Sequence, residues 1–108
     1  MTDLEYIAEN LSEEDILCQI AEEAAELSKA ALKLRRVLTG TNPTPVSYED
    51  AIYNLIEEYG DVVGAFRIYA KKSEIDTEVY EISNENIESK FYRKAQQIKE
   101  EKEHGERN

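Results

Sequence analysis

The prolines of this 108-residue chain, the strongest helix breakers, are confined to one short stretch. Both prolines and one of the four glycines lie in residues 39–45. On either side of that stretch, apolar residues recur every three or four positions, which is the spacing of an amphipathic helix. They are Ile16, Ile20, Ala24, Leu27, Ala31, Leu34 and Leu38 before it, and Ile52, Leu55, Ile56, Tyr59, Val62, Val63, Phe66 and Ala70 after it. The pattern predicts two long antiparallel helices joined by a loop, within an all-α helical bundle.

Polar residues mark the expected ends of these two helices. Ser12 and Ser47 are placed to cap their N-termini, and Asp15 occupies the capping-box position after Ser12. Gly40 is expected to end the first helix, and residues 71–73, Lys-Lys-Ser, are expected to close the second.

The segments outside the two long helices are predicted from weaker patterns. A short N-terminal helix is indicated by Leu4, Ile7, Ala8 and Leu11. Residues 74–82 fit either a short helix or an extended connection, after which Ser83 or Asn84 can cap a third, C-terminal helix. The apolar positions of that helix are Ile87, Phe91, Ala95 and Ile98. We therefore expect one helical domain over residues 1–98 and a charged, frayed tail over residues 99–108.

The charge balance narrows the classes of partner. The chain has 24 acidic and 13 basic residues, a formal charge of −11 at pH 7. No stretch supplies the basic face that a nucleic acid polymer or an anionic membrane requires. One cysteine, Cys18, and one histidine, His104, exclude an intramolecular disulfide and a Cys/His zinc cluster. With no signal-peptide pattern and no long apolar run, we expect a cytoplasmic protein.

Two pairs of acidic residues differ from the other acids by their spacing and position. Glu23 and Glu26 lie three residues apart on the first long helix, and Glu58 and Asp61 lie three apart on the second. Residues at that spacing share one helix face. In each pair the first carboxylate lies at the edge of the apolar stripe and the second lies beside it. If the two stripes pack together, the four carboxylates converge at the edge of the core.

Converging carboxylates repel one another unless a cation lies between them. A site made only of oxygen ligands selects a hard ion, so we expect Mg²⁺, for which Mn²⁺ can substitute. Mg²⁺ commonly binds substrate phosphates as well as protein ligands, which points to a phosphorylated ligand. The alternative is that these acids belong to ordinary solvated helix faces, since pairs at this spacing also arise by chance in a chain rich in Glu.

The two acidic motifs, in this order on consecutive helices, resemble a known signature. Residues 22–27 read EEAAEL, and residues 57–62 read EEYGDV. This resembles the EExxE and ExxD pattern of the MazG-like, all-α nucleoside triphosphate pyrophosphohydrolase superfamily. The resemblance covers roughly Ile16 to Ile98. It departs from the family in the gap of 31 residues between Glu26 and Glu58, which is longer than usual.

The resemblance implies a specific activity and site. Family members cleave a nucleoside triphosphate between the α and β phosphates, giving the monophosphate and pyrophosphate. The Mg²⁺ ligands would be Glu23, Glu26, Glu58 and Asp61, with Glu23 or Glu26 as the base that activates water, and Glu22 as a less certain ligand. Lys90, Arg93 and Lys94 would hold the remaining phosphates, although each also fits a solvated helix face. Homodimers or homotetramers are expected.

The sequence leaves open whether the protein is catalytic and why two glycines lie inside a helix. A non-catalytic helical module that binds a partner or a nucleotide would also fit the pattern, whereas a ferritin-like di-iron protein would not, because its Glu-x-x-His pairs are missing. Gly60 and Gly64 lie inside the second long helix, where each costs roughly 1 kcal/mol relative to Ala. Close packing of another helix, the approach of a ligand to the backbone, or poor optimisation of the helix would each explain them.

Overall fold

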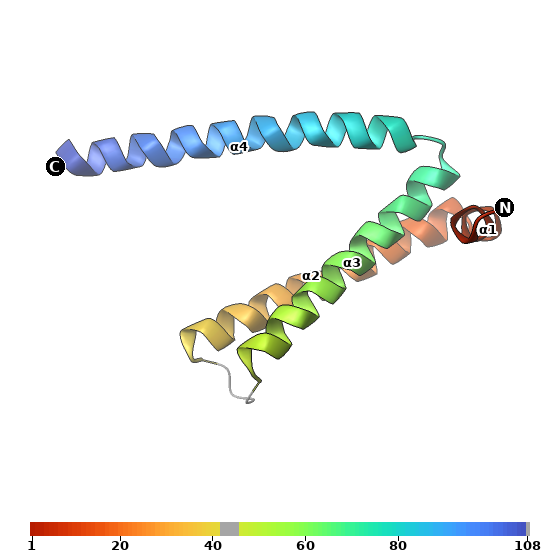
Figure 1. Ribbon diagram of the computed structural model, residues 1–108, viewed down its shortest axis with the longest axis horizontal. Helices are drawn as coiled ribbons and strands as arrows, with labels where there is room; N and C mark the ends of the chain where they lie inside the picture. The colour runs from red at the N-terminus through yellow and green to blue at the C-terminus, as the bar shows by residue number, and fades with distance from the viewer. Residues whose placement is uncertain (42–45, 108) are drawn as a thin grey trace. The chain divides into compact units, whose positions relative to one another are not determined.

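The computed structural model describes residues 1–41 and 46–107 of the chain (Figure 1). Its helices are α1 (Asp3–Asn10), α2 (Glu13–Thr39), α3 (Tyr48–Lys72) and α4 (Asp76–Arg107), and the described residues contain no strand. The prediction of an all-α chain is therefore confirmed. Residues 42–45, which include both prolines of the predicted loop, lie outside the described residues.

Capping side chains begin the helices where the sequence predicts. The Ser12 and Ser47 hydroxyls each accept a hydrogen bond of 3.1 Å, from the backbone N–H groups of Asp15 and Asp50. These bonds satisfy N–H groups that have no partner in the first helical turn. At the end of α2, Gly40 adopts a left-handed backbone conformation with φ of 71°, which glycine reaches without the steric cost of a Cβ.

The C-terminal helix differs from the prediction at its start. It begins at Asp76, so that neither Ser83 nor Asn84 caps it. The Ser83 hydroxyl donates to the Tyr80 carbonyl at 3.4 Å, a bond made inside a helix, and the acids Asp76 and Glu78 in the first turn favour the N-terminus there. The sequence predicts fraying from residue 99, and the structure continues the helix to Arg107.

The chain forms two compact units, Met1–Glu74 and Ile75–Asn108. The first contains α1, α2 and α3, with α2 packed along α3 and α1 packed against α3. Its buried apolar residues are small except for Ile16, which is 1% exposed; the others are Ala8, Ala30, Ala51, Ala65 and Ala70. No helix in the described part of the chain is both long and apolar enough to span a membrane.

The contact between α2 and α3 follows a repeat of alternating four and three residues, which we call the seam. Apart from Lys33, the least exposed positions of α2 are Ile16, Ile20, Glu23, Leu27, Ala30, Leu34 and Val37, and those of α3 include Ala51, Leu55, Glu58, Val62, Ala65, Tyr69 and Lys72. This mean spacing of 3.5 residues is that of paired helices, whereas the predicted stripe drifts as a straight helix does. Three of the predicted core residues, Ala24, Ala31 and Leu38, are accordingly exposed.

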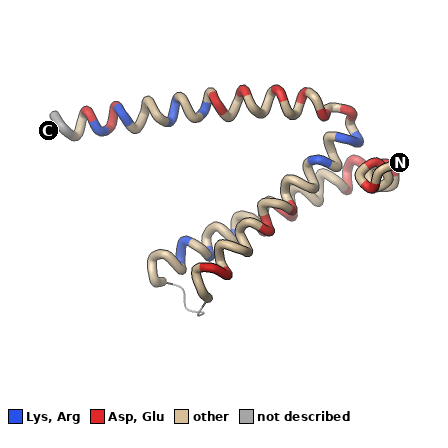
Figure 2. The backbone as a smooth tube through the Cα atoms, viewed as in Figure 1, with Lys and Arg blue, Asp and Glu red and all other residues tan. Residues whose placement is uncertain are grey.

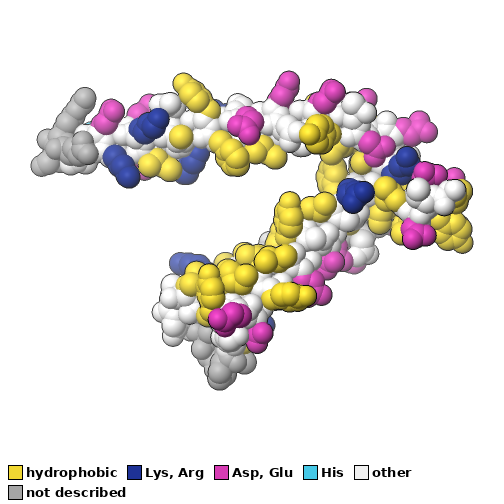
Figure 3. Space-filling view, viewed as in Figure 1, with side chains coloured by type: hydrophobic (Ala, Val, Ile, Leu, Met, Phe, Trp, Pro, Cys, Tyr) yellow, Lys and Arg dark blue, Asp and Glu magenta, His cyan; other side chains and the backbone are white. Residues whose placement is uncertain are grey.

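A second apolar stripe on α3 lies one residue beyond the seam and is open to solvent. Ile56 and Tyr59 are each 61% exposed, and Val63 and Phe66 are 37% and 41% exposed. Figure 3 shows hydrophobic side chains gathered along this helix. The sequence places these residues in the core together with Leu55 and Val62, but only the latter two face α2.

Ile16 tests the contribution of the seam to stability. Replacing it by Ala removes the largest fully buried side chain of the described residues. We expect Ile16→Ala to lower the free energy of unfolding by about 3 kcal/mol, because it leaves a cavity that the small neighbours cannot fill. Leu17→Ala, at an adjacent position that is 46% exposed, is the control and should cost less than about 1 kcal/mol. Urea denaturation measures both, and equal losses would contradict the assigned seam.

Candidate metal centre

Glu23 and Glu58 occupy seam positions at which the other residues of the repeat are mostly apolar. The register of the two helices places them opposite each other. The Tyr69 hydroxyl on α3 donates to a Glu13 carboxylate oxygen on α2 at 3.2 Å, and Glu23 and Glu58 lie three turns further along the same antiparallel contact. Both side chains are half-buried. The sequence places Glu23 at the edge of the core stripe, and the 3.5-residue repeat moves it into the seam itself.

Asp61 completes a cluster with these two residues, which we call the acidic trio. One carboxylate oxygen from each of Glu23, Glu58 and Asp61 lies within 4.8 Å of the others. Asp61 is exposed and stands one helical turn beyond Glu58 on α3. Three of the four predicted metal ligands are thus brought together by the packing of α2 on α3.

The pKa of Glu58 is affected by its position in the seam and by the neighbouring carboxylates. Its pKa is raised above the ordinary value of 4.5, first by desolvation at the seam and then by the negative charge of Asp61. Glu26, Glu23 and Glu57 add smaller contributions in the same direction. A raised pKa means that the ionised carboxylate is held at a cost to the folded state.

Glu23 is held by a residue that the sequence analysis did not single out. The Gln19 side-chain amide donates to a Glu23 carboxylate oxygen at 2.6 Å. Gln19 lies four residues before Glu23 on α2, so the two side chains meet on one helix face. The four-residue spacing of Gln19 and Glu23 is visible in the sequence and could have predicted this hydrogen bond.

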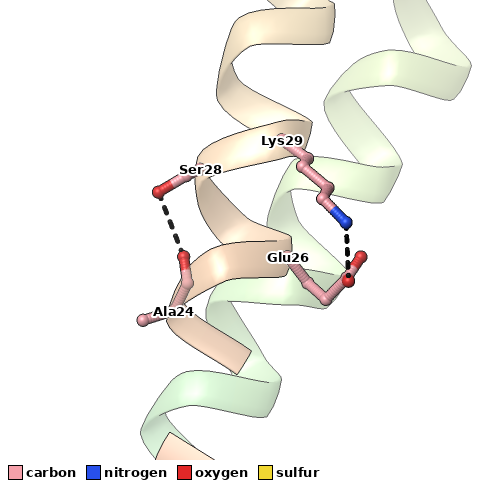
Figure 4. Close-up of polar contacts among 4 residues, drawn as sticks. All are labelled: Ala24, Glu26, Ser28 and Lys29. Atoms are coloured by element: carbon pink, nitrogen blue, oxygen red, sulfur yellow. Dashed lines mark hydrogen bonds and ion pairs between the residues drawn. The ribbon is translucent and has the colours of Figure 1, made fainter. Parts of the chain in front are cut away.

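Glu26 lies outside the acidic trio in the structure. Its carboxylate forms an ion pair of 3.3 Å with Lys29 on the same helix, as Figure 4 shows. The carboxylate is 52% exposed and the lysine side chain 74% exposed. Exposed pairs of this kind contribute little energy, so the pair leaves the Glu26 side chain free to reorient. Its assignment as a metal ligand stays a prediction.

The predicted phosphate-binding residues belong to the second unit. Lys90, Arg93 and Lys94 lie on α4, and all three are exposed. The Lys94 ammonium donates to the side-chain oxygen of Gln97 at 3.5 Å. Their assignment to substrate phosphates stays a prediction.

A groove of about 510 Å³ runs along the α2–α3 contact beside the acidic trio. Glu23 and Asp61 form part of its wall, together with Leu11, Asp15, Gln19, Gly60, Gly64, Ala65 and Ile68. A Cβ added at Gly60 or Gly64 would meet no atom within 4 Å. The glycines therefore do not serve close helix packing within the described residues, and they leave their backbone open to the groove.

The acidic trio fits a small divalent cation. Its donors are all carboxylate oxygens, the ligands that Mg²⁺ and Mn²⁺ prefer. Two ligands on opposite sides of Mg²⁺ stand roughly 4.2 Å apart, since each lies about 2.1 Å from the ion. The 4.8 Å within which the three oxygens lie is close to this value.

Comparison with protein-family models, curated proteins and solved structures gave no match. The interpretation of the site therefore depends on its geometry and on the resemblance of the two acidic motifs.

The raised pKa of Glu58 predicts how the metal-free protein responds to pH. In Glu58→Gln the charge that crowds the seam is removed, so we expect a higher melting temperature than wild type at pH 7 without metal. The gain should shrink as the pH falls through the raised pKa of Glu58 in the folded state, and it should vanish below 4.5, where Glu58 is protonated in the folded and the unfolded states alike. Glu22→Gln, an exposed position on α2, is the control and should show no such gain. Thermal denaturation across pH tests this, and a lower melting temperature for Glu58→Gln at pH 7 would contradict it.

Proposed function

We propose that this chain is a Mg²⁺-dependent nucleoside triphosphate pyrophosphohydrolase, which cleaves its substrate between the α and β phosphates. The observation that carries the proposal is the face-to-face placement of Glu23 and Glu58 in the seam, with Asp61 beside them. The resemblance of the EExxE and ExxD motifs to the MazG-like superfamily supplies the reaction.

The cost of this arrangement is the reason to regard it as functional. Apolar residues at positions 23 and 58 would continue the seam and stabilise the packing of α2 on α3, whereas two carboxylates repel each other there. Positions that break the local folding pattern without a structural gain are commonly functional sites. A cation between the carboxylates removes the repulsion and gives the arrangement a purpose.

Other residues of the chain are candidates to activate water, to orient Glu23 and to bind the outer phosphates. When bound, Mg²⁺ would neutralise the triphosphate and lower the pKa of the attacking water. Glu26 is our candidate for the base that accepts a proton from that water, because it lies outside the trio and is exposed. Gln19 fixes the orientation of Glu23 through its hydrogen bond. Lys90, Arg93 and Lys94 are the candidates to hold the outer phosphates.

The exposed stripe of α3 supports the expectation of a homodimer or homotetramer. Ile56, Tyr59, Val63 and Phe66 form a continuous apolar row on the outer face of the hairpin. A small chain gains stability by covering such a row with a second copy. We propose that the active form is an oligomer assembled through this stripe.

Substitution of the trio tests the activity. We expect Glu23→Gln and Asp61→Asn each to lower pyrophosphate release from a set of nucleoside triphosphates by about 10²-fold or more, because each removes a charged oxygen ligand. Calorimetric binding of Mn²⁺ should weaken in parallel. Glu14→Gln, an exposed position on α2, is the matched control and should retain both properties.

The outcome distinguishes the two candidate functions. Full activity in Glu23→Gln and Asp61→Asn would contradict the assigned site. Wild-type protein that binds Mn²⁺ and nucleotide through the trio but releases no pyrophosphate would instead be a nucleotide-binding module. Absence of any binding that depends on these carboxylates would leave an interaction module.

Gly60 and Gly64 test whether the groove receives the substrate. Since neither position is crowded, Gly60→Ala and Gly64→Ala should each raise the free energy of unfolding by about 1 kcal/mol. If part of the nucleotide lies in the groove, both variants should also show a raised KM. Gly105→Ala on α4, equally uncrowded, is the control and should leave KM unchanged. An unchanged KM in all three variants would place the substrate elsewhere.

A further inference from the structure

Helix α4 has an apolar stripe whose large side chains are all exposed. Tyr80, Ile87, Phe91 and Ile98 are 71%, 45%, 64% and 42% exposed, and they recur at intervals of seven, four and seven residues. These intervals place them on one face in the repeat of paired helices, with Asn84 and Lys94 at the two intermediate positions. Helices in water owe most of their stability to the packing of such a face. The stripe of α4 is therefore built for a helical partner.

Along residues 76–99 of this helix the acids come first and the bases follow, whereas residues 100–107 contain both, as Figure 2 shows. Residues 76–89 contain five acids and no Lys or Arg, whereas residues 90–99 contain four bases and no Asp or Glu. The acids are Asp76, Glu78, Glu81, Glu85 and Glu88, and the bases are Lys90, Arg93, Lys94 and Lys99. Residues 76–99 of one helix are thus complementary in charge to the same residues of a second helix that runs in the opposite direction.

We propose that α4 pairs with α4 of a second copy of this chain, antiparallel and centred on Ser89. Positions whose numbers sum to 178 are then level with each other. Ile87 meets the partner's Phe91, and Tyr80 meets the partner's Ile98, so that all four apolar positions of the stripe are matched. Asn84 lies level with the partner's Lys94, which pairs the two polar positions of the stripe with each other.

The charges decide the orientation. In the antiparallel pair residues 76–89, with charge −5, lie along the partner's residues 89–102, with charge +3. A parallel pair would place acid on acid over residues 76–89, which is unfavourable. Like charges approach at the centre of the antiparallel pair, where Glu88 and Lys90 each lie near their own counterparts, and near its ends, where Glu78 lies level with the partner's Glu100. The attraction along the rest of the pair outweighs these contacts.

The length of the stripe favours a second α4 as the partner over the exposed stripe of α3. The α3 stripe runs from Ile56 to Phe66, whereas the α4 stripe runs from Tyr80 to Ile98, so the α3 stripe would leave part of the α4 stripe uncovered. A second α4 matches all four apolar positions.

Disulfide trapping in the full chain tests the pairing and its direction. In a Cys18→Ser background, Asn84→Cys and Lys94→Cys are each made as single variants, both at exposed positions. A mixture of the two should give a 84–94 cross-linked dimer under mild oxidation. Each variant alone should not cross-link, because like positions are ten residues out of register, about 15 Å along the helix, which is beyond disulfide reach. Ile82→Cys, on the opposite face of α4, is the control and should not cross-link with either variant.

A second measurement separates this contact from the α3 stripe. Ile87→Lys should weaken self-association, measured by sedimentation, at least about tenfold, because it buries a charge in the pairing stripe. Ile82→Lys, which adds the same charge on the opposite face, should have no effect. Cross-linking of Asn84→Cys with itself would overturn the antiparallel pairing. Equal association of both lysine variants, or the absence of the mixed dimer, would overturn the pairing altogether.

Discussion

The contact between α2 and α3 determines both the packing of the first unit and the position of the acidic trio. Two helices that pack along their whole length must follow a repeat of 3.5 residues, so the positions that face each other are fixed once the first contact is set. Most of those positions hold apolar residues, and three of them are alanines, Ala30, Ala51 and Ala65, whose small side chains allow the helices to approach closely. The same geometry brings Glu23 and Glu58 face to face, and no loop or strand is needed to build the acidic trio.

The site therefore depends on the same contact that holds the hairpin together. Desolvation and then the negative charge of Asp61 raise the pKa of Glu58, so ionised Glu58 is expected to reduce the stability of the metal-free fold. A core made largely of small residues has little surplus stability to spare. Metal binding, if it occurs as proposed, would couple the integrity of the α2–α3 contact to the occupancy of the site.

Several features of the fold could be predicted because they depend on local physics. The capping by Ser12 and Ser47 follows from hydrogen bonds within one helical turn, and the end of α2 follows from the conformational freedom of Gly40. The start of α4 was missed because Ser83 can bond to a helical carbonyl as readily as it can cap, and the sequence does not show which it does. Gln19 was missed although its spacing from Glu23 was visible.

The sequence by itself determined that the chain is helical and which helices carry the acidic pairs, because apolar periodicity, caps and residue spacing all act over a few neighbouring residues. It could not determine the phase of the α2–α3 contact. A straight helix and a paired helix differ by only about 20° per seven residues, yet this difference exposes Ala24, Ala31 and Leu38 and moves Glu23 from the rim into the seam. Only the packing of one helix on the other decides that phase, since it is set by the partner's side chains.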